Sequence, residues 1–360
     1  MRPACARIDL SALRHNLTIA RQHAATARVM AVIKANGYGH GLVRVATALE
    51  GADAFGVACM EEAQALREAG MAGRIVLLEG FFAADELASI ARLDLDLVVH
   101  HDWQIEALER WSDKQPLRLW LKVDSGMHRL GFAPERAVVA RERLLHSGVC
   151  RGVPCLMTHF ANADVREDRT TERQIERFNS ATEGLPGPRS LANSAGLLGF
   201  ADSRADWVRP GIMLYGVSPF AQGDGRALDL RPAMTLTTRL IAINRYRAGD
   251  CLGYGGSWCC PEPMAVGVAA IGYGDGYPRH APSGTPVLVG GQRSQLLGRV
   301  SMDMVMVDLR GLPEVRIGDP VTLWGEGLPV EEVARHAGTI AYELLCNVSQ
   351  RVRMEEAGGD

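Results

Sequence analysis

Hydrophobic positions follow one pattern over the first two-thirds of the chain and another over the last third. In the first part, short apolar runs alternate with stretches in which apolar residues recur every three or four positions. Such runs predict buried strands, here Val29–Ile33, Ala54–Ala58, Ile75–Leu78, Leu95–Val99, Leu117–Val123, Val153–Thr158, Ser190–Ala192 and Trp207–Val208. Helical spacing lies between them, at Glu61–Glu68, Ala84–Ala91, Trp103–Trp111, Pro134–Leu145 and Thr171–Ala181. About eight strand-then-helix units in series predict a TIM-like parallel (β/α)8 barrel.

The pattern changes after about residue 230. Short runs rich in β-branched residues, broken by Gly290-Gly291 and Gly298, predict antiparallel strands at Met234–Ile243, Thr285–Val289, Gln295–Val300 and Met302–Leu309. Helical spacing returns only at Pro329–His336 and Ala341–Leu345. We therefore expect an α/β barrel domain over residues 1–230 and a mostly antiparallel β domain over residues 231–360.

Composition excludes several classes of protein. The 360 residues are 47% hydrophobic and carry a net charge of only −3, without the basic stripe of a nucleic-acid-binding protein. No apolar run approaches the roughly 20 residues of a membrane helix, and the N-terminus lacks the apolar core of a signal peptide. We expect a cytoplasmic protein that binds neither nucleic acid nor a membrane. Its eight scattered cysteines are then expected to be free, mostly buried thiols, and no metal site is predicted.

Polar residues follow five of the expected barrel strands. They are Lys34, Lys122, His159, the pair Asn193-Ser194, and Arg209. A strand often ends in a polar residue, so each position alone carries little weight. The carboxyl ends of barrel strands form the face that bears active sites, however. The five together therefore predict a site at this rim.

Lys34 is the sharpest of these candidates. It ends an apolar strand and precedes the glycine-rich segment Ala35–Gly41. A lysine at the mouth of a low-dielectric barrel has its charged form disfavoured, which makes a nucleophilic amine available for a Schiff base. The glycines allow a loop to approach a ligand closely. A solvated lysine before an ordinary turn is the alternative.

Nine segments in the same order closely resemble alanine racemases, a family of fold-type III pyridoxal-phosphate enzymes. They are Ala31–Gly41, Leu121–Phe132, Met157–Phe160, Asn193–Ala195, Trp207–Gly216, Gly253–Gly256, Ile271–Tyr277, Gly298–Met304 and Ala341–Leu344. The resemblance spans nearly the whole chain. It implies a barrel and a β domain in a head-to-tail homodimer, with pyridoxal 5′-phosphate as cofactor and alanine as substrate.

The resemblance implies two catalytic residues. Lys34 would carry the cofactor as a Schiff base and later act as one acid/base, and Tyr254 of the partner subunit would be the other. Racemisation takes the Cα proton from one face and returns a proton on the other, so two groups on opposite faces suit it. Without the resemblance, Tyr254 would be read as a turn aromatic among glycines.

The resemblance also assigns the cofactor contacts. Arg209 would bond the pyridine nitrogen and, because an arginine keeps its proton, would leave that nitrogen unprotonated. His159 would hold Arg209 in place. The remaining cofactor-binding residues, most of them neutral donors to the phosphate, would be Tyr38, Asn193, Ser194, Gly211, Ile212 and Tyr342.

Substrate contacts follow in the same way. Arg129 would engage the substrate carboxylate, with the backbone of Met302 opposite, donated by the partner subunit. Lys122 matches a lysine that many family members carbamylate, which would turn a repelling cation into an anion that pairs with Arg129. Tyr273 would line the channel to the substrate together with Tyr342, favouring a side chain as small as methyl.

Three other functions compete with alanine racemisation. A decarboxylase of the same fold would place a carboxylate beside the pyridine nitrogen, where this chain has Arg209. A non-catalytic cofactor-carrying barrel would lack the β domain with Tyr254 and Met302. A broad-specificity racemase of small amino acids would need a roomier pocket. Supply of D-alanine for the cell wall and alanine catabolism both remain open as the role.

Overall fold

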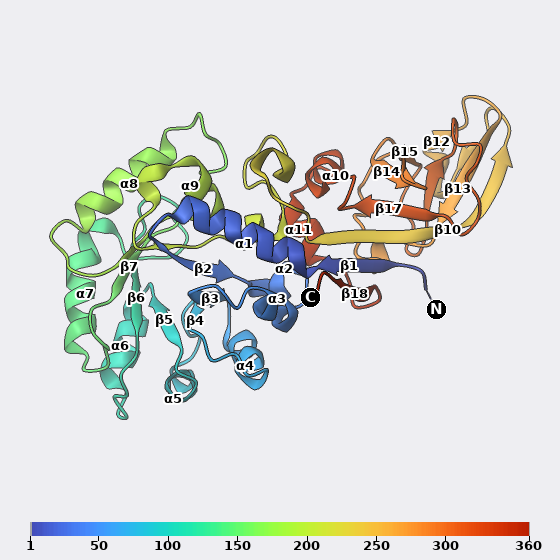
Figure 1. The fold of residues 1–360 in the computed structure, drawn as a ribbon. Helices are drawn as coiled ribbons and strands as arrows, with labels where there is room; N and C mark the ends of the chain where they lie inside the picture. Colours follow the sequence, from blue (N-terminus) through green and yellow to red (C-terminus); the bar gives the residue numbers. More distant parts are fainter. Residues whose placement is uncertain (1, 360) are drawn as a thin grey trace. The chain divides into compact units, whose positions relative to one another are not determined.

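The structure is a computed structural model that describes residues 2–359, and it divides into two compact units. The barrel unit comprises Asn16–Leu214 and Pro219–Gln222. The β unit comprises the described residues of Met1–His15, Tyr215–Ser218 and Gly223–Asp360. Figure 1 draws the ribbon and labels helices and strands where there is room.

The barrel unit contains the expected closed ring of parallel strands. Each strand pairs with the next along the chain, and the last pairs with the first. In chain order they are β2 (Arg28–Val32), β3 (Ala54–Val57), β4 (Ile75–Leu77), β5 (Asp96–Val99), β6 (Leu119–Lys122), β7 (Cys155–Met157), β8 (Arg189–Ser190) and β9 (Trp207–Val208). The eight strands predicted from apolar runs are thus confirmed, with ends that differ by up to two residues. The last two are short because only two residues of each make ladder pairs.

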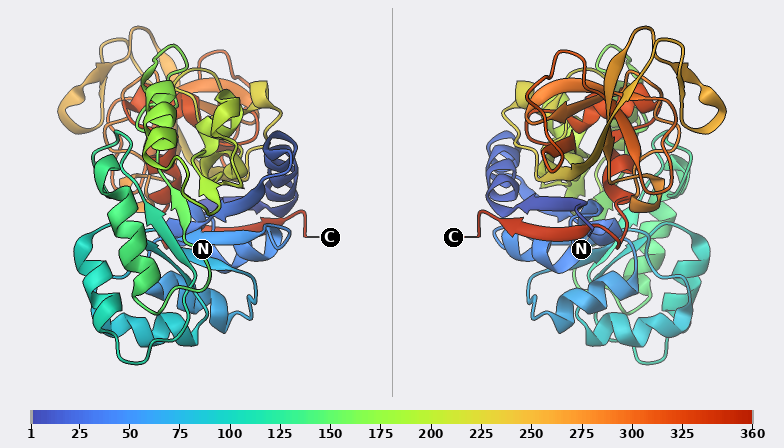
Figure 2. Two further views of the ribbon diagram at one scale, coloured as in Figure 1. Left: turned by 90° about the vertical axis from the view of Figure 1, so that its left-hand side faces the viewer. Right: turned by 90° about the vertical axis from the view of Figure 1, so that its right-hand side faces the viewer.

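Helices follow the barrel strands and lie outside them (Figure 2). They are α3 (Leu42–Ala48), α4 (Met60–Glu68), α5 (Leu87–Arg92), α6 (Asp102–Arg110), α7 (Ala137–His146), α8 (Thr170–Ala181) and α9 (Ser194–Gly199); α1 (Leu10–Ala24) precedes β2. The short segment α2 (Lys34–Tyr38) has left-handed backbone angles and is not a regular α-helix. Two expected helices, Ala84–Ala91 and Pro134–Leu145, begin as a 3-10 turn and continue as α-helix. Pro134 lies in the first turn, where its missing N–H leaves no helical bond unmade.

Side chains from alternate strand positions fill the barrel. A buried cluster joins Met30, Ala54, Val76, Val98, Trp120, Cys155, Met157 and Trp207. Within it the rings of Trp120 and Trp207 meet edge to face, with centroids 5.5 Å apart. A packed interior leaves the strand ends as the place where a ligand can be bound.

The β unit is built on a largely antiparallel sheet. Its strand order is β13-β16-β15-β14-β17-β10-β1-β18, and β10 also pairs with β13. The strands are β1 (Cys5–Asp9), β10 (Met234–Tyr246), β13 (Met264–Ala269), β14 (Pro286–Val289), β15 (Gln292–Leu297), β16 (Val305–Asp308), β17 (Pro320–Trp324) and β18 (Arg353–Ala357). A separate hairpin pairs β11 (Cys251–Leu252) with β12 (Trp258–Cys259), and the helices are α10 (Val330–Ala337) and α11 (Ala341–Cys346).

The sequence pattern misplaced two strands of this sheet. Gln295–Val300 is shifted, because β15 starts at the Gly290-Gly291 turn and ends before Gly298, whose φ is +70°. The expected strand Met302–Leu309 begins only at Val305. Met302 therefore lies in the loop between β15 and β16, and the Ser301 N–H donates to the Met304 carbonyl at 3.0 Å.

The two units divide the chain differently from the boundary expected at residue 230. Strand β1 pairs antiparallel with β10 and parallel with β18, so the N-terminal residues belong to the β unit. Figure 1 shows β1 running beside β10 and β18. A five-residue strand at a chain end carries little periodic signal, and its pairing partners lie more than 200 residues away.

The expectation that all cysteines are free was wrong. Cys251 and Cys259 face each other across β11 and β12 and form a disulfide. The other six are in no disulfide, and of these Cys5, Cys155 and Cys260 are buried, while Cys346 is exposed. Sequence spacing did not reveal the bond because register within a two-residue hairpin decides which cysteines meet.

Candidate active site

The residues expected at the rim do gather at the carboxyl ends of the barrel strands. Lys34 lies two residues beyond β2, Lys122 ends β6, His159 lies two residues beyond β7, and Arg209 directly follows β9. The electrostatic surroundings of His159 include Arg209, Lys122, Arg129 and Lys34. The rim therefore concentrates positive charge, which suits an anionic ligand.

Arg209 is the most enclosed of these cations, with 4% of its surface exposed. Its Nη1 donates to Ser190 Oγ at 2.6 Å, and its Nη2 donates to the carbonyls of Thr158 at 2.7 Å and Leu191 at 3.2 Å. Burial lowers the pKa of Arg209 to about 10, so the guanidinium stays charged at neutral pH. A buried charge held by several acceptors keeps a fixed orientation.

His159 lies beside this guanidinium, with Nδ1 3.4 Å from Arg209 Nη2. Burial, followed by the positive charges of Arg209 and Lys122, holds the pKa of His159 well below its usual range. The imidazole is therefore neutral at physiological pH, and its Nδ1 can accept from the arginine. Its backbone carbonyl accepts from Gln174 Nε2 at 3.1 Å, which fixes the loop that carries it.

Lys122 is buried, with 7% of its surface exposed, at the end of β6. Burial, and then the charges of Arg209, Arg129 and Lys34, lower the pKa of Lys122 to about 8. An appreciable fraction of the amine is thus neutral near physiological pH. The low-dielectric surroundings that we expected for Lys34 are found at Lys122.

Lys34 itself is 38% exposed and faces a carboxylate that the sequence analysis missed. Its Nζ lies 3.7 Å from Glu79 Oε1. Glu79 follows β4 by two residues, as Lys34 follows β2, so its position relative to the strand end could have flagged it. Glu79 also fixes a neighbour through its carbonyl, to which His100 Nε2 donates at 3.0 Å.

The segment after Lys34 forms a left-handed turn. Residues 35–38 all have φ between +51° and +62°, although only Gly37 is a glycine. A left-handed conformation costs roughly 1–2 kcal/mol at an ordinary residue such as Ala35 or Tyr38. The sequence predicted positive φ at the glycines alone. Strain of this kind concentrates at functional sites and persists only where the surroundings enforce it.

Hydrogen bonds between side chains and the backbone enforce the turn. His40 is fully buried, and its Nδ1 donates to the carbonyls of Tyr38 at 2.8 Å and Gly37 at 3.1 Å. Burial lowers the pKa of His40 to about 4, so the ring is neutral. Glu62 Oε1 accepts from the Asn36 N–H at 3.1 Å, and Asn36 Oδ1 accepts from the Leu42 N–H at 2.9 Å. The result is a rigid link from Lys34 to Tyr38.

The hydroxyl of Tyr38 lies so close to Gly211 that only glycine fits at position 211. A Cβ placed on Gly211 would lie 2.6 Å from Tyr38 Oη. Ser194 Oγ accepts from the Gly211 N–H at 2.8 Å, and Ile212 follows as a buried residue. Neutral donors from three separate segments therefore converge at this point. The set suits a phosphate, which binds well to hydroxyls and backbone N–H groups.

Asn193 has a different local task. Its Oδ1 accepts from the Gly196 N–H at 2.8 Å and so caps the first turn of α9. This bond fixes the start of the helix and thereby the position of Ser194. Asparagine is among the preferred residues for this role.

Arg129 lies exposed on the loop that follows β6. Asp124 shapes this loop, since its Oδ1 accepts from the N–H groups of Gly126, Met127 and His128 at 2.9–3.0 Å. Burial alone would raise the pKa of Asp124, but the N–H donors lower it further than burial raises it. The carboxylate remains ionised and holds the turn that presents Arg129.

Four expected site residues belong to the β unit, and all are exposed there. They are Tyr254 (69%), Tyr273 (39%), Met302 (52%) and Tyr342 (37%). Two of them sit side by side, because the Tyr273 N–H donates to the Ser301 carbonyl at 3.0 Å and the Gly274 N–H to the Met302 carbonyl at 2.9 Å. Buried Asp275 braces this corner, accepting from Arg2 Nη2 at 2.6 Å.

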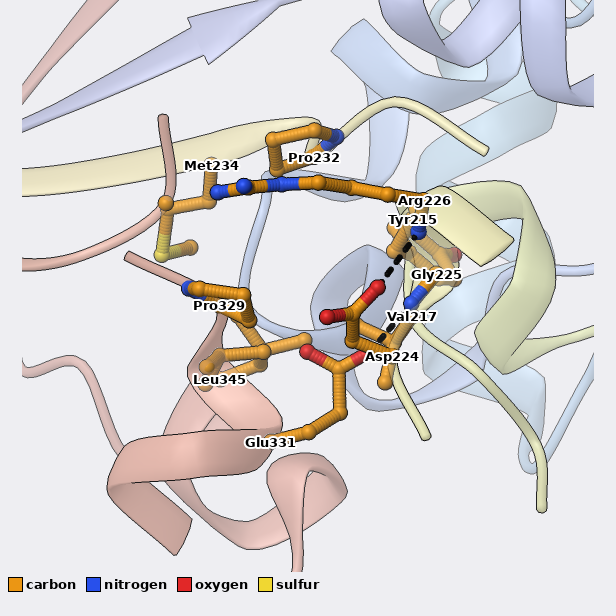
Figure 3. A pocket seen from close by; sticks show the side chains of 13 residues that line it. Tyr215, Val217, Asp224, Gly225, Arg226, Pro232, Met234, Pro329, Glu331 and Leu345 are labelled. Atoms are coloured by element: carbon orange, nitrogen blue, oxygen red, sulfur yellow. Dashed lines mark hydrogen bonds between the residues drawn. The ribbon is translucent and has the colours of Figure 1, made fainter. Parts of the chain in front are cut away.

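A small pocket elsewhere in the β unit is not a candidate. Figure 3 shows Glu331 and Asp224 at its wall. Glu331 Oε1 accepts from the N–H groups of Ser218 and Gly225, each at 2.9 Å, so its carboxylate already has partners. Burial raises the pKa of Glu331. None of the expected site residues lines this pocket, and Glu331 serves to tie two loop residues to α10.

Comparison with known proteins decides between the families that share this architecture. A family model described as the N-terminal domain of alanine racemase matches residues 8–219, and one for the C-terminal domain matches residues 233–355. The chain belongs to the alanine racemase family. The alanine racemase of Halorhodospira halophila is 57% identical over 360 residues, covering 100% of this chain and 99% of that protein.

Solved alanine racemase structures share the fold. The biosynthetic alanine racemase from Pseudomonas aeruginosa has a TM-score of 0.97 at 49% identity, with 99% of this chain and 100% of that one covered. The alanine racemase from Bartonella henselae, solved with covalently bound pyridoxal phosphate, has a TM-score of 0.91 at 28% identity, with 99% and 100% covered.

These matches confirm several expectations from the sequence. The alanine racemase family consists of pyridoxal-phosphate-dependent racemases, so the enzyme class, the cofactor and the barrel-plus-β-sheet fold are as predicted. A decarboxylase and a non-catalytic barrel are thereby set aside. No helix within residues 2–359 is long and apolar enough to cross a membrane.

Proposed function

We propose that the chain interconverts L- and D-alanine with two acid/base groups, Lys34 and Tyr254 of the partner subunit. The observation that carries this is the rim itself, where an amine, Lys34, shares a cationic cluster with the buried guanidinium of Arg209. When bound, pyridoxal phosphate draws electrons from the amino acid and weakens its Cα–H bond. Everything else is done by the protein's own residues.

Lys34 would attach the cofactor and then hold or return the proton at Cα on one face. Glu79, 3.7 Å from Lys34 Nζ, stabilises the amine whenever it carries that proton. The rigid left-handed turn after Lys34 keeps the amine at a constant distance from the phosphate donors around Tyr38. Both features support a base whose position is set before substrate binds.

Arg209 would donate to the pyridine nitrogen and keep it unprotonated. Its pKa of about 10 supports this, since a group that stays charged at neutral pH cannot give up its proton. A cofactor held in this way would be a weaker electron sink, which would favour return of a proton at Cα over side reactions. His159, neutral and 3.4 Å away, would hold the guanidinium in register without competing for charge.

The phosphate would be held by Tyr38, Ser194 and the backbone at Gly211 and Ile212, with Asn193 positioning Ser194 and with Tyr342 as a further neutral donor. The tight approach of Tyr38 to Gly211 supports this assignment, because a side chain at position 211 would displace the hydroxyl. Neutral donors are enough for a phosphate at a rim already rich in cations.

Arg129 would bind the substrate carboxylate, with the backbone of Met302 of the partner subunit opposite, and Lys122 would orient Arg129. With a pKa of about 8, about one Lys122 in ten is neutral at pH 7 and can add carbon dioxide to give a carbamate. The carbamate would replace a repelling cation with an anion that orients Arg129. Tyr273, beside Met302, would narrow the channel and favour alanine over bulkier substrates, which a broad-specificity racemase would accept.

A head-to-tail homodimer in the cytoplasm completes the proposal. Tyr254 and Met302 are exposed in the β unit, which supports their use by a second copy of the chain. A phenol acting as a base also needs donors or positive charge nearby, and the cationic rim of another subunit would supply them.

Two measurements test this function. Borohydride treatment of the holoenzyme should fix the cofactor to the Lys34 nitrogen, and a peptide map that finds the label elsewhere would overturn the assignment. Tyr254→Phe should slow racemisation by about 10²–10³-fold while solvent deuterium still exchanges into one alanine enantiomer without inversion. Equal loss of exchange with both enantiomers would contradict two separate bases.

A further inference from the structure

The disulfide of the β unit encloses the candidate base. Cys251 lies in β11 and Cys259 in β12, and the 3-10 turn Tyr254–Gly256 lies between them. The two cysteines are direct partners in the hairpin register. The bond therefore joins two cysteines that are eight positions apart in the sequence, and it closes the loop that carries Tyr254.

The loop is anchored at its base and free at its tip. Leu252 and Cys260 are buried in a cluster with Met264, Val266 and Leu297. Tyr254, by contrast, is 69% exposed. Glycines at 253, 255 and 256 flank it, all with positive φ between +51° and +73°. Glycines in such a loop leave the chain many alternative conformations, so the hydrophobic anchor alone does not fix the phenol.

We propose that the Cys251–Cys259 disulfide positions Tyr254 for proton transfer, and that thiol–disulfide exchange at this bond switches the activity. The proposal rests on Tyr254 being the second acid/base group. A cross-link at the neck of the loop removes conformations in which the hydroxyl points away from the substrate. Proton transfer requires close and constant placement, so a looser loop lowers the rate without preventing binding.

Both cysteines are exposed in the single chain, so a thiol in solution can reach the disulfide and exchange with it. A dithiol reductant attacks one sulfur and displaces the other as a thiolate. Its second thiol then releases the first cysteine, so the protein gains two electrons and two protons while the reductant becomes a cyclic disulfide. Oxidised glutathione reverses the change and leaves as two reduced glutathiones. In a reducing compartment a persistent exposed disulfide is more often a sensor than a structural bond.

The test uses the full-length holoenzyme in three forms: oxidised, reduced with dithiothreitol, and reoxidised with oxidised glutathione. Alkylation after denaturation should count six thiols in the oxidised form and two more in the reduced form. Reduction should lower kcat about tenfold and change KM less than about twofold, and reoxidation should restore kcat. Deuterium exchange without inversion should persist for one enantiomer in the reduced form.

Two variants serve as controls. The double variant Cys251→Ser, Cys259→Ser should have the kcat of the reduced enzyme, and neither dithiothreitol nor oxidised glutathione should change it. Cys150→Ser, which removes a free cysteine of the barrel unit, should respond as the parent does. The proposal is overturned if the oxidised form has eight thiols, if the double variant keeps the parent kcat, or if reduction lowers exchange with both enantiomers equally.

Failure here is distinguishable from failure of the proposed function. If Tyr254→Phe leaves exchange unchanged for both enantiomers, then Tyr254 is not the base and the proposed function is wrong. If Tyr254→Phe has the expected effect but reduction does not alter kcat, then only the positioning role of the disulfide is refuted.

Discussion

The two ends of the barrel treat buried charge in opposite ways. At the amino ends of the strands, Asp96 is fully buried between two arginines, with Arg118 Nε donating to Oδ1 at 2.6 Å and Arg74 bonded to Oδ2. The indole of Trp120 adds a third donor at 3.0 Å. At the carboxyl ends, Lys122 and Arg209 are buried beside further cations, and Glu79 is a partly exposed counter-charge.

The difference separates stability from function. A buried carboxylate with a full set of donors is important for the stability of the fold, because its removal would leave the buried donors without an acceptor. A buried lysine among other cations lowers stability: burial first, and then repulsion by its neighbours, lowers the pKa of Lys122 to about 8. An unfavourable cluster of cations of this kind is expected where the protein binds an anion, because perturbed pKa values and strained backbone both concentrate at functional sites. Four substitutions sharpen the contrast, and each could break it.

Lys34→Ala should have the largest effect. Without the amine, the cofactor has no covalent attachment and one face of Cα has no base, so racemisation should fall by at least about 10⁴-fold. The melting temperature should stay close to that of the parent in the absence of cofactor, because Lys34 is partly exposed. Kinetics on the protein with cofactor and calorimetry on the protein without it check both halves. Appreciable residual activity would mean that the rim uses another amine.

Asp96→Ala, at the amino ends of the barrel strands, should lower stability and leave the activity nearly unchanged. Loss of the carboxylate leaves Arg74, Arg118 and the Trp120 indole without their acceptor, and should lower the free energy of unfolding by about 4 kcal/mol. The kcat of the folded fraction, measured well below the melting temperature, should change less than about twofold. A large loss of kcat with normal stability would erase the distinction between the two ends.

Lys122→Met should stabilise the protein at neutral pH. The pKa of Lys122 is lowered on folding from the usual 10.5 to about 8, so folding is penalised fully below pH 8 and less as pH rises toward 10.5. The shift corresponds to about 3 kcal/mol at pH 7. Denaturant unfolding of cofactor-free protein in buffer free of carbon dioxide should show this gain at pH 7 and little gain near pH 10. A gain that is constant with pH would show that the buried charge of Lys122 is not its source.

Gly211→Ala should have the smallest effect. The new methyl group would lie 2.6 Å from Tyr38 Oη and displace the hydroxyl from the phosphate donors. Cofactor affinity should fall about tenfold, which is about 1.4 kcal/mol. Equilibrium dialysis against pyridoxal phosphate measures it, and the double variant Gly211→Ala, Tyr38→Phe is the control. If the two substitutions have additive effects, Tyr38 and Gly211 do not act as one cradle.

The sequence by itself determined the architecture. Eight apolar runs separated by helical spacing defined the barrel, because strand and helix periods are local properties that neighbouring residues express together. Polar residues such as Lys34 and Arg209 at the ends of those runs predicted a shared rim, since parallel strands in a barrel end at one face. The family motifs then named the chemistry.

Only the tertiary structure decided how those residues are held. Glu79 facing Lys34, the burial of Lys122 and the left-handed turn after Lys34 all depend on contacts between segments that are distant in sequence. The same holds for β1, which joins β10 and β18, and for the disulfide between Cys251 and Cys259. The local sequence pattern decides which helices and strands form. The charges that surround a side chain, the strain in a turn and the pairing of strands or cysteines depend on which helices and strands come into contact. That is set by packing of the whole chain.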